Sequence, residues 1–341
     1  MIMRGSIQGW RWGAFILLAL AGMSAQADTV RLKMSHFLGP NSFFQVDLVE
    51  PWARELERKT GGKVQVEVLN ARSPLGNVRK QARQVESGEV DIALGLRGAE
   101  GDRFPRSAIV ELPFVVADAG SGSKALWRLY QEGVLAEEYQ GFKVLALFVH
   151  NPGLIHTKAT LVSEPADLKG LRLRAPNATV ALMLEHVGAV PKLLQPDEII
   201  PALRAHQLDG IVTNWGTPIA GFNDEMTRHT AVPFYASAFF IVMKQSRFDA
   251  LPADVRQAID SLSGDGLVAR FGPLWNQWDK PFYDGAQAPG KVMLRPDAAL
   301  LQRWKVALQP VSEAYVSRLQ TQGFANAREV YERLLAEPAG R

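Results

Sequence analysis

The sequence contains no cysteine among its 341 residues. Disulfides, thiolate metal sites and cysteine nucleophiles are therefore excluded, and the stability of the fold must come from packing. The motifs of several enzyme classes are missing too: G-x-S-x-G, H-E-x-x-H, G-x-x-x-x-G-K-[ST] and a G-x-G-x-x-G between a strand and a helix. The six histidines lack the spacings typical of metal ligands. We therefore expect no metal and no cofactor.

Blocks of basic residues interleaved with aromatic residues are also absent, so we expect no nucleic-acid partner. The N-terminus instead combines Arg4 and Arg11 with an apolar stretch over 13–21 and the small-x-small site Ala25-Gln26-Ala27. These features predict a secretory signal peptide, residues 1–27. The apolar stretch is much shorter than the ~20 residues that span a bilayer, so we expect cleavage after Ala27 and a periplasmic location rather than a membrane anchor.

Removal of residues 1–27 takes away two of the 38 basic residues and none of the 35 acidic ones, which leaves a net charge of +1. A net charge so close to zero does not indicate any particular class of binding partner. The remaining length exceeds one ordinary hydrophobic core, so two lobes are expected. No later segment is apolar for long enough to span a membrane.

Hydrophobic periodicity predicts strands that alternate with helices along most of the chain. This alternation favours parallel-rich α/β sheets covered by helices on both faces. The strands are expected over Val30–Ser35, Val64–Leu69, Asp91–Leu94, Val144–Val149, Arg172–Ala175 and Ile211–Thr213, and the helices over about Ser42–Thr60, Val78–Ser87, Ala178–His186 and Ile199–Ala205.

A long extended run, Phe234 to Met243, is predicted as a strand that passes from one lobe to the other. From Ala253 onward the chain is mostly helical by period. The expected division places residues 28–150 and about 238–277 in lobe I, and residues 151–237 and about 278–341 in lobe II and the C-terminal helices.

Three segments carry a resemblance to a known family. They read Asp102-Arg103-Phe104-Pro105 followed by Glu111-Leu112-Pro113-Phe114, then Asp167 to Pro176 with the sequence DLKGLRLRAP, then Gly188-Ala189-Val190-Pro191 and Leu208-Asp209-Gly210. In this order and spacing the chain resembles the solute-binding proteins of TRAP (tripartite ATP-independent periplasmic) transporters over roughly residues 30 to 335.

The resemblance implies an α/β periplasmic-binding-protein fold with a ligand cleft between two lobes and a helical C-terminal region. It also implies a receptor that captures a small organic acid and delivers it to an integral-membrane TRAP permease, without catalysis. The signature ligand contact of the family falls on Arg174. A guanidinium suits that role because its planar fork donates two parallel hydrogen bonds to a carboxylate.

Two departures from the family pattern affect the predicted ligand. The family's "D-G-x-E-N" segment reads Asp209 to Trp215 here, with no glutamate and with the asparagine one place later, at Asn214. Gly153 stands where many members have a second arginine. A compact monocarboxylate with an apolar, aromatic or branched body is therefore expected rather than a heavily polar ligand.

Other candidates follow strand ends, where ligands of open α/β sheets bind. Trp215 either covers the apolar end of the ligand or packs within a lobe. Arg97 is either a second positive contact or a solvated loop residue, and His36 either touches ligand or forms structural hydrogen bonds. The remaining candidates are His150 and Asn151, which reach the cleft or belong to the hinge, and one of Phe239 or Phe240, which lines the pocket while most neighbouring aromatics fill the core.

Two other classes of protein share this fold. One is the binding protein of an ABC importer or a sensor kinase, which the motif order near Phe104 and Arg174 disfavours. The other is a periplasmic enzyme, which the missing catalytic motifs disfavour only weakly, because catalytic groups assemble in space rather than along the sequence.

Overall fold

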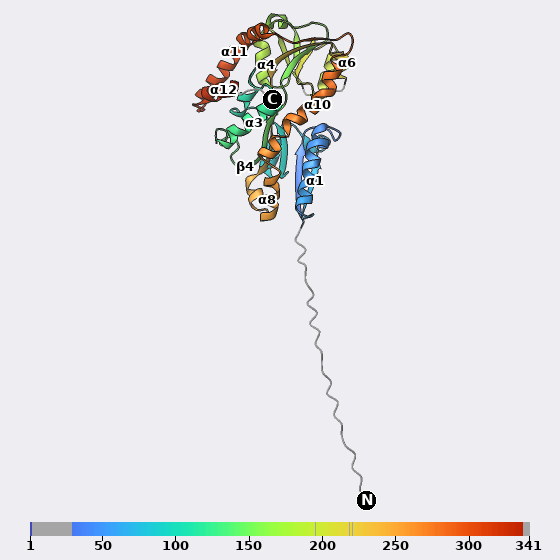
Figure 1. Cartoon of the computed structure of the whole chain (residues 1–341), viewed down its shortest axis with the longest axis vertical. Coiled ribbons are helices and arrows are strands. Elements are labelled where there is room, and N and C mark those ends of the chain that lie inside the picture. Colours follow the sequence, from blue (N-terminus) through green and yellow to red (C-terminus); the bar gives the residue numbers. More distant parts are fainter. Residues whose placement is uncertain (2–28, 195, 218, 220, 337–341) are drawn as a thin grey trace.

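The computed structural model describes residue 1 and residues 29–336, except 195, 218 and 220 (Figure 1). The predicted signal peptide, apart from Met1, lies outside the described residues. Within the described part, no helix has both the length and the apolarity needed to cross a bilayer. Figure 1 shows two lobes one above the other, with α1 and α8 in the lower lobe and α4 and α6 in the upper one.

The lower lobe, lobe I, is built on a five-stranded sheet in the order β2-β1-β3-β10-β4. Its parallel part consists of β1 (Val30–His36), β2 (Val64–Leu69) and β3 (Ile92–Leu96). The strand β10 (Ala238–Lys244) runs antiparallel to both of its neighbours, β3 and β4 (Phe142–Val149). The three parallel strands thus end at one edge of the sheet.

The upper lobe, lobe II, is built on a six-stranded sheet in the order β11-β9-β5-β8-β6-β7. Within it β6 is parallel to both β7 and β8, whereas β5 is antiparallel to both β8 and β9. The strands are β5 (Gly153–Thr157), β6 (Arg172–Ala175), β7 (Val190–Leu193), β8 (Gly210–Thr213), β9 (Arg228–Tyr235) and β11 (Val292–Leu294).

Helices lie between most of these strands, as the alternating periodicity predicts. Lobe I carries most of the early helices, and the last third of the chain is largely helical. The helices are α1 (Glu50–Lys59), α2 (Gln81–Ser87), α3 (Ala119–Gln131), α4 (Ala178–His186), α5 (Pro196–Arg204), α6 (Phe222–Glu225), α7 (Gln245–Asp249), α8 (Ala253–Ser261), α9 (Asp265–Val268), α10 (Phe271–Gly285), α11 (Ala298–Thr321) and α12 (Ala327–Leu335).

The first helix differs from the single α-helix expected over about Ser42–Thr60. It begins as a π-helix, Phe44–Val49, and α-helical geometry starts only at Glu50. Pro51 follows directly and has no N–H to donate to the carbonyl four residues earlier. A locally wider turn before the proline fits this missing bond.

The run Phe234–Met243 forms two strands rather than the single crossing strand that its sequence predicts. Tyr235 pairs with Gly153 in the second sheet, and Ala238 pairs with Val149 in the first. Between them Ser237 donates its backbone N–H to Nε2 of His150 at 2.9 Å. The chain therefore does pass between the lobes here, beside the connection from β4 to β5, but it changes sheets at Ala236 and Ser237.

The helices α10 and α11 join the two cores as well. Trp275 and Trp278 of α10 pack in the core of lobe I, whereas Tyr283 lies against a core of lobe II. On α11, Trp304 and Leu308 belong to the lobe II core, and Tyr315 with Val316 to the lobe I core. Pro310 lies inside this helix, between the two sets.

Candidate ligand-binding site

A cleft of about 1590 Å³ lies between the lobes. From lobe I it is lined by the loops that follow β1, β2 and β3, including Phe37, Arg72 and Gly98. From lobe II it is lined by the segments that follow β6 and β7, including Pro176 and Leu194. These loops leave the carboxyl ends of parallel strands, the usual place for a ligand in an open α/β sheet.

The charged residues of the cleft are mainly cationic. Among the described lining residues, Arg72, Arg79, Arg174 and Arg204 are opposed only by Asp224. A concave surface with one dominant sign of charge attracts ions of the opposite sign. The cleft is thus suited to an anionic ligand.

Arg174 is the best-defined of these cations. It belongs to β6 and is 5% exposed, yet it lines the cleft. Its Nε donates to the carbonyl of Leu194 at 3.0 Å, and its Nη1 donates to the carbonyl of Val212 at 3.4 Å. These two bonds fix the direction of the guanidinium while leaving other N–H groups available, since an arginine carries five.

No carboxylate among the described residues forms an ion pair with Arg174. Burial lowers the pKa of its guanidinium, and Tyr235 partly offsets this shift. A guanidinium nevertheless stays protonated in proteins. A buried cation of this kind is stabilised by an anion that enters the cleft, because a buried charge is costly unless it is paired.

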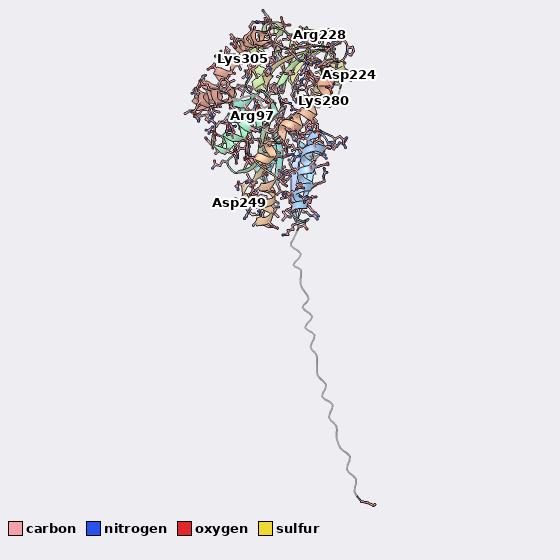
Figure 2. All side chains as sticks on the ribbon, viewed as in Figure 1. Arg97, Asp224, Arg228, Asp249, Lys280 and Lys305 are labelled. Atoms are coloured by element: carbon pink, nitrogen blue, oxygen red, sulfur yellow. The ribbon has the colours of Figure 1, made fainter. Side chains whose placement is uncertain are left out.

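Arg97 lies behind the cleft wall rather than among the described lining residues. Its Nη2 and Nε donate to Glu111 at 2.5 and 3.0 Å, and both side chains are buried. Burial opposes the charge of Arg97, but the charge of Glu111 outweighs this effect and raises the pKa of Arg97. Figure 2 shows Arg97 near mid-height of the folded part, close to where the lobes meet.

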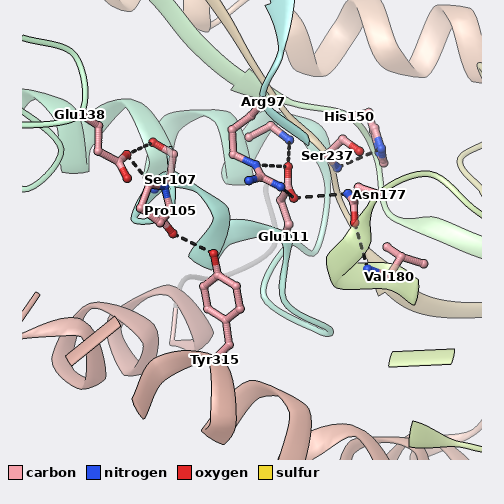
Figure 3. Close-up of polar contacts among 11 residues, drawn as sticks. Arg97, Pro105, Ser107, Glu111, Glu138, His150, Asn177, Val180, Ser237 and Tyr315 are labelled. Atoms are coloured by element: carbon pink, nitrogen blue, oxygen red, sulfur yellow. Dashed lines mark hydrogen bonds and ion pairs between the residues drawn. The ribbon is translucent and has the colours of Figure 1, made fainter. Parts of the chain in front are cut away.

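Glu111 also connects the lobes. Its carboxylate accepts a hydrogen bond from the backbone N–H of Ala238 at 2.9 Å and one from Nδ2 of Asn177 at 3.3 Å (Figure 3). Asn177 lines the cleft, and its Oδ1 caps α4 by accepting from the N–H of Val180 at 2.9 Å. A continuous polar network therefore runs from Arg97 in lobe I to the first turn of α4 in lobe II.

His36 is fully buried at the end of β1. Its Nε2 contacts Oε1 of Gln45 at 3.1 Å, and its Nδ1 accepts from the N–H of Leu38 at 3.3 Å. Burial lowers the pKa of His36, although the hydrogen bond to Gln45 acts in the opposite direction. The ring holds the loop whose next residues, Phe37 and Leu38, line the cleft.

His150 and Asn151 lie in the connection from β4 to β5. His150 accepts from Ser237 and contacts the carbonyl of Asn151 at 2.5 Å, and burial lowers the pKa of its ring to about 4. The side chain of Asn151 accepts from the N–H of Ala119 and donates to Asp279, both at 2.8 Å. Both residues contact segments at the junction of the lobes and neither is among the described cleft-lining residues.

Asn214 follows β8, as expected. Its Nδ2 donates to Asp279 at 3.2 Å, and its Oδ1 accepts from the hydroxyl of Thr217 at 2.5 Å. Trp215 is buried in lobe II, with its ring centroid 4.6 Å from that of His156 and 5.8 Å from that of Tyr283. The structure thus brings Asn214 to the junction of the lobes. Trp215 was expected either to cover the apolar end of the ligand or to pack within a lobe, and the structure shows it packed within lobe II.

Phe239 is part of an aromatic cluster in lobe I, with ring centroids 5.5 Å from Phe44 and 5.0 Å from Phe148. Phe240 is fully buried and covers Gly95 on β3. Of the eight predicted contact residues, only Arg174 lines the cleft among the described residues. The other seven are not among these lining residues, and their contacts with ligand remain predictions.

Sequence reasoning missed Asn177, Glu111 and Asp279. Asn177 had a usable signal, because an asparagine just before the predicted helix Ala178–His186 is a typical N-cap. Glu111 stood in the sequence only as part of the family segment Glu111-Leu112-Pro113-Phe114, and Asp279 had no signal, since its partners lie 63 to 128 residues away in the sequence.

Comparison with known proteins agrees with this geometry. Residues 34–318 match the model of the family described as bacterial extracellular solute-binding protein, family 7. The chain belongs to this family. Members of the family are solute-binding receptors, so the resemblance to TRAP solute-binding proteins and the α/β fold with two lobes are confirmed.

Three relatives illustrate the match. A TRAP solute-binding protein of Rhodoferax ferrireducens T118, solved with copurified benzoate, is 30% identical, with a TM-score of 0.83 over 90% of this chain and 97% of that one. A marine metagenome TRAP protein specific for aromatic acid ligands, solved with 3-hydroxybenzoate, is 28% identical, with a TM-score of 0.83 over 90% and 98% of the chains. A Comamonas testosteroni protein named outer membrane transporter protein TsaT is 26% identical over 95% and 96% of the chains.

Proposed function

We propose that this family 7 receptor binds an aromatic or branched organic acid in the cleft and delivers it to a TRAP membrane permease. The main observation in support of this proposal is Arg174, a buried guanidinium on the cleft wall without an acidic partner among the described residues. A carboxylate that enters the cleft would supply the missing negative charge.

The body of the ligand is proposed from two further observations. Much of the wall is apolar, with Phe37, Leu38, Pro176 and Leu194 among its residues. Two relatives that share the fold at 28% and 30% identity were solved with benzoate or 3-hydroxybenzoate. Closure of the lobes would bury the ring between these walls, and the permease would recognise the closed form.

Export forms part of the proposal. The signal peptide over residues 1–27 would direct the chain to the periplasm, where the mature receptor would meet both its ligand and the permease. No catalytic step is proposed, because binding and release are sufficient for delivery.

A thermal-shift screen tests the proposed ligand class. Benzoate should raise the melting temperature, because a ligand that binds only the native state stabilises it by RT ln(1 + [L]/Kd). Benzamide, which keeps the ring and loses the charge, should have little effect at the same concentration. If neutral sugars or cationic amino acids stabilise the protein more than benzoate does, the proposed ligand class is wrong.

A further inference from the structure

Two arginines line the lobe I side of the cleft without a partner in the fold. Arg72 and Arg79 lie in the connection from β2 to α2, and both are exposed. Across the described part of the chain, neither side chain forms an ion pair or a hydrogen bond. Their backbone N–H groups, by contrast, donate to Oδ1 of Asn70 at 3.1 Å and to Oδ1 of Asn77 at 2.9 Å. The two charges therefore belong to the cleft surface rather than to the packing of the fold.

The backbone that carries these arginines is held in place by buried contacts. Nε2 of Gln81, a fully buried residue, donates to the carbonyl of Leu75 at 3.1 Å and to that of Asn77 at 2.9 Å. A methyl group added to Gly76 would lie 2.2 Å from the carbonyl oxygen of Asn70, so the chain folds back closely on itself here. The loop thus holds two cations at a fixed place on the cleft without using them for its own stability.

The other charged residues of the cleft differ from this pair. Arg174 is buried and bound to two carbonyl groups, and Nε of Arg204 lies 3.2 Å from Oε1 of Glu225. Asp224, the one acidic residue among the described lining residues, belongs to lobe II as these arginines do. The described lining residues of lobe I therefore carry two positive charges and no negative one.

We propose that Arg72 and Arg79 attract the anionic ligand into the cleft and so raise its rate of association, whereas Arg174 holds the ligand once it is bound. The inference rests on the proposed carboxylate-binding function. Charges of one sign on a concave surface raise the local concentration of an oppositely charged ligand. Solvated charges of this kind act mainly on encounter, whereas a desolvated charge pair acts on the rate of release.

The variant Arg72→Gln/Arg79→Gln tests this role by stopped-flow measurement of benzoate binding. In about 0.01 M salt, where the Debye length is about 30 Å, the association rate constant should fall roughly three- to tenfold. The dissociation rate constant should stay within about twofold of the wild-type value. In about 1 M salt the Debye length is only about 3 Å, so variant and wild type should associate at nearly the same rate. The melting temperature of the ligand-free protein should be nearly unchanged, because neither side chain supports the fold.

Charge reversal and a matched control sharpen the test. Arg72→Glu/Arg79→Glu should associate more slowly than the glutamine variant at low salt, because the loop would then repel the ligand. The control is Lys59→Gln/Lys124→Gln, which removes the same net charge from exposed positions on α1 and α3, outside the described lining of the cleft. It should associate with benzoate within about twofold of the wild type, since only charges near the cleft focus the field there.

The outcomes distinguish this inference from the function on which it rests. If the glutamine variant associates with benzoate as fast as the wild type at low salt, steering by the two arginines is overturned while the carboxylate receptor stands. Steering is also overturned if the loss of affinity lies in faster dissociation, which would make these arginines contacts of the bound ligand. An equal fall in the lysine control would attribute the effect to the net charge of the protein. If the wild type binds no carboxylate at all, the proposed function fails first and the inference fails with it.

Discussion

The carboxylate of Asp279 on α10 accepts a hydrogen bond from the side chain of Asn151 at 2.8 Å. It also accepts one from Asn214 at 3.2 Å and one from the backbone N–H of Gly216 at 2.5 Å. One buried carboxylate thus joins the β4–β5 connection, the loop after β8 and a helix that contacts both lobes.

Replacing Asp279 by alanine should destabilise the protein strongly, because three buried donors lose their acceptor. We expect the free energy of unfolding to fall by about 3 kcal/mol, measured by urea denaturation. The control is Asp284→Ala on the same helix. Asp284 pairs with Lys280 at the surface, so its loss should cost less than about 1 kcal/mol. Equal midpoints for the two variants would contradict the importance of Asp279.

Replacing Arg174 by methionine should abolish tight binding of a carboxylate. Removing one partner of a buried, hydrogen-bonded charge pair costs about 2–5 kcal/mol, which corresponds to a loss of roughly 30-fold to several thousand-fold in affinity. Arg174→Lys keeps the charge without the planar fork and should bind with intermediate affinity.

The matched control for Arg174 is Arg172→Met, two residues earlier on β6. Arg172 pairs with Asp209 at the surface and should not affect affinity. Calorimetric titration with benzoate checks all three variants. An Arg174→Met protein that folds and binds within a few-fold of the wild type would remove Arg174 from the site.

The ion pair of Arg97 and Glu111 should stabilise the fold rather than bind the ligand directly. Arg97→Met leaves the buried carboxylate of Glu111 without its cationic partner, so the free energy of unfolding should fall by about 3–5 kcal/mol. The double variant Arg97→Met/Glu111→Gln should recover part of this loss, because no uncompensated charge is left. Arg303→Met, which breaks an exposed pair with Glu164, should cost less than about 1 kcal/mol. A stable Arg97→Met protein that loses only benzoate affinity would instead support the direct ligand contact predicted from the sequence.

Acid should destabilise the protein through His150. Burial holds the pKa of His150 at about 4 in the folded state, against 6.5 for an unperturbed histidine. As pH falls below 6.5 the unfolded chain takes up a proton that the folded chain does not, so stability is lost between pH 6.5 and about 4. The loss from this residue is about 2 kcal/mol at pH 5 relative to pH 8.

Urea denaturation at the two pH values checks this linkage. His150→Gln should show a smaller pH-dependent loss than the wild type, whatever its absolute stability. His206→Gln, at an exposed position, is the control for the substitution itself. An unchanged pH dependence in His150→Gln would show that another group is responsible.

The mature chain should begin at Asp28. A signal peptidase requires small side chains at the site formed by Ala25 and Ala27, so Ala27→Asp should slow processing. Edman sequencing of protein recovered from the periplasm checks the terminus. Recovery of periplasmic protein that starts at Met1 would contradict cleavage.

The sequence predicted those parts of the fold that depend on local patterns. The strand Arg172–Ala175 coincides with β6, and the helix Ala178–His186 coincides with α4, because alternation and helical spacing are properties of a short window. Arg174 was predicted because the resemblance to the family places its signature ligand contact there, at a position in such a strand and beside Pro176. Its place on the cleft wall agrees with that prediction.

The remaining features depend on contacts between distant segments. The chain changes sheets at Ala236 and Ser237, where the sequence has neither glycine nor proline. The change arises because the partner strand switches from β5 to β4. In the sequence, Gly153 was notable only because many members of the family have an arginine at this position. Its role as the space beneath the ring of Tyr235 requires two strands that lie more than 80 residues apart in the chain.

The helix α11 has a mechanical consequence for closure of the cleft. Its first half is anchored by Trp304 and Leu308 in one core and its second half by Tyr315 and Val316 in the other. Any rotation of one lobe against the other must therefore deform this helix, and the missing N–H of Pro310 makes the segment between the anchors the most compliant part. The helix α11 thus couples the two lobes mechanically, so that a movement of one core is transmitted to the other through the segment around Pro310.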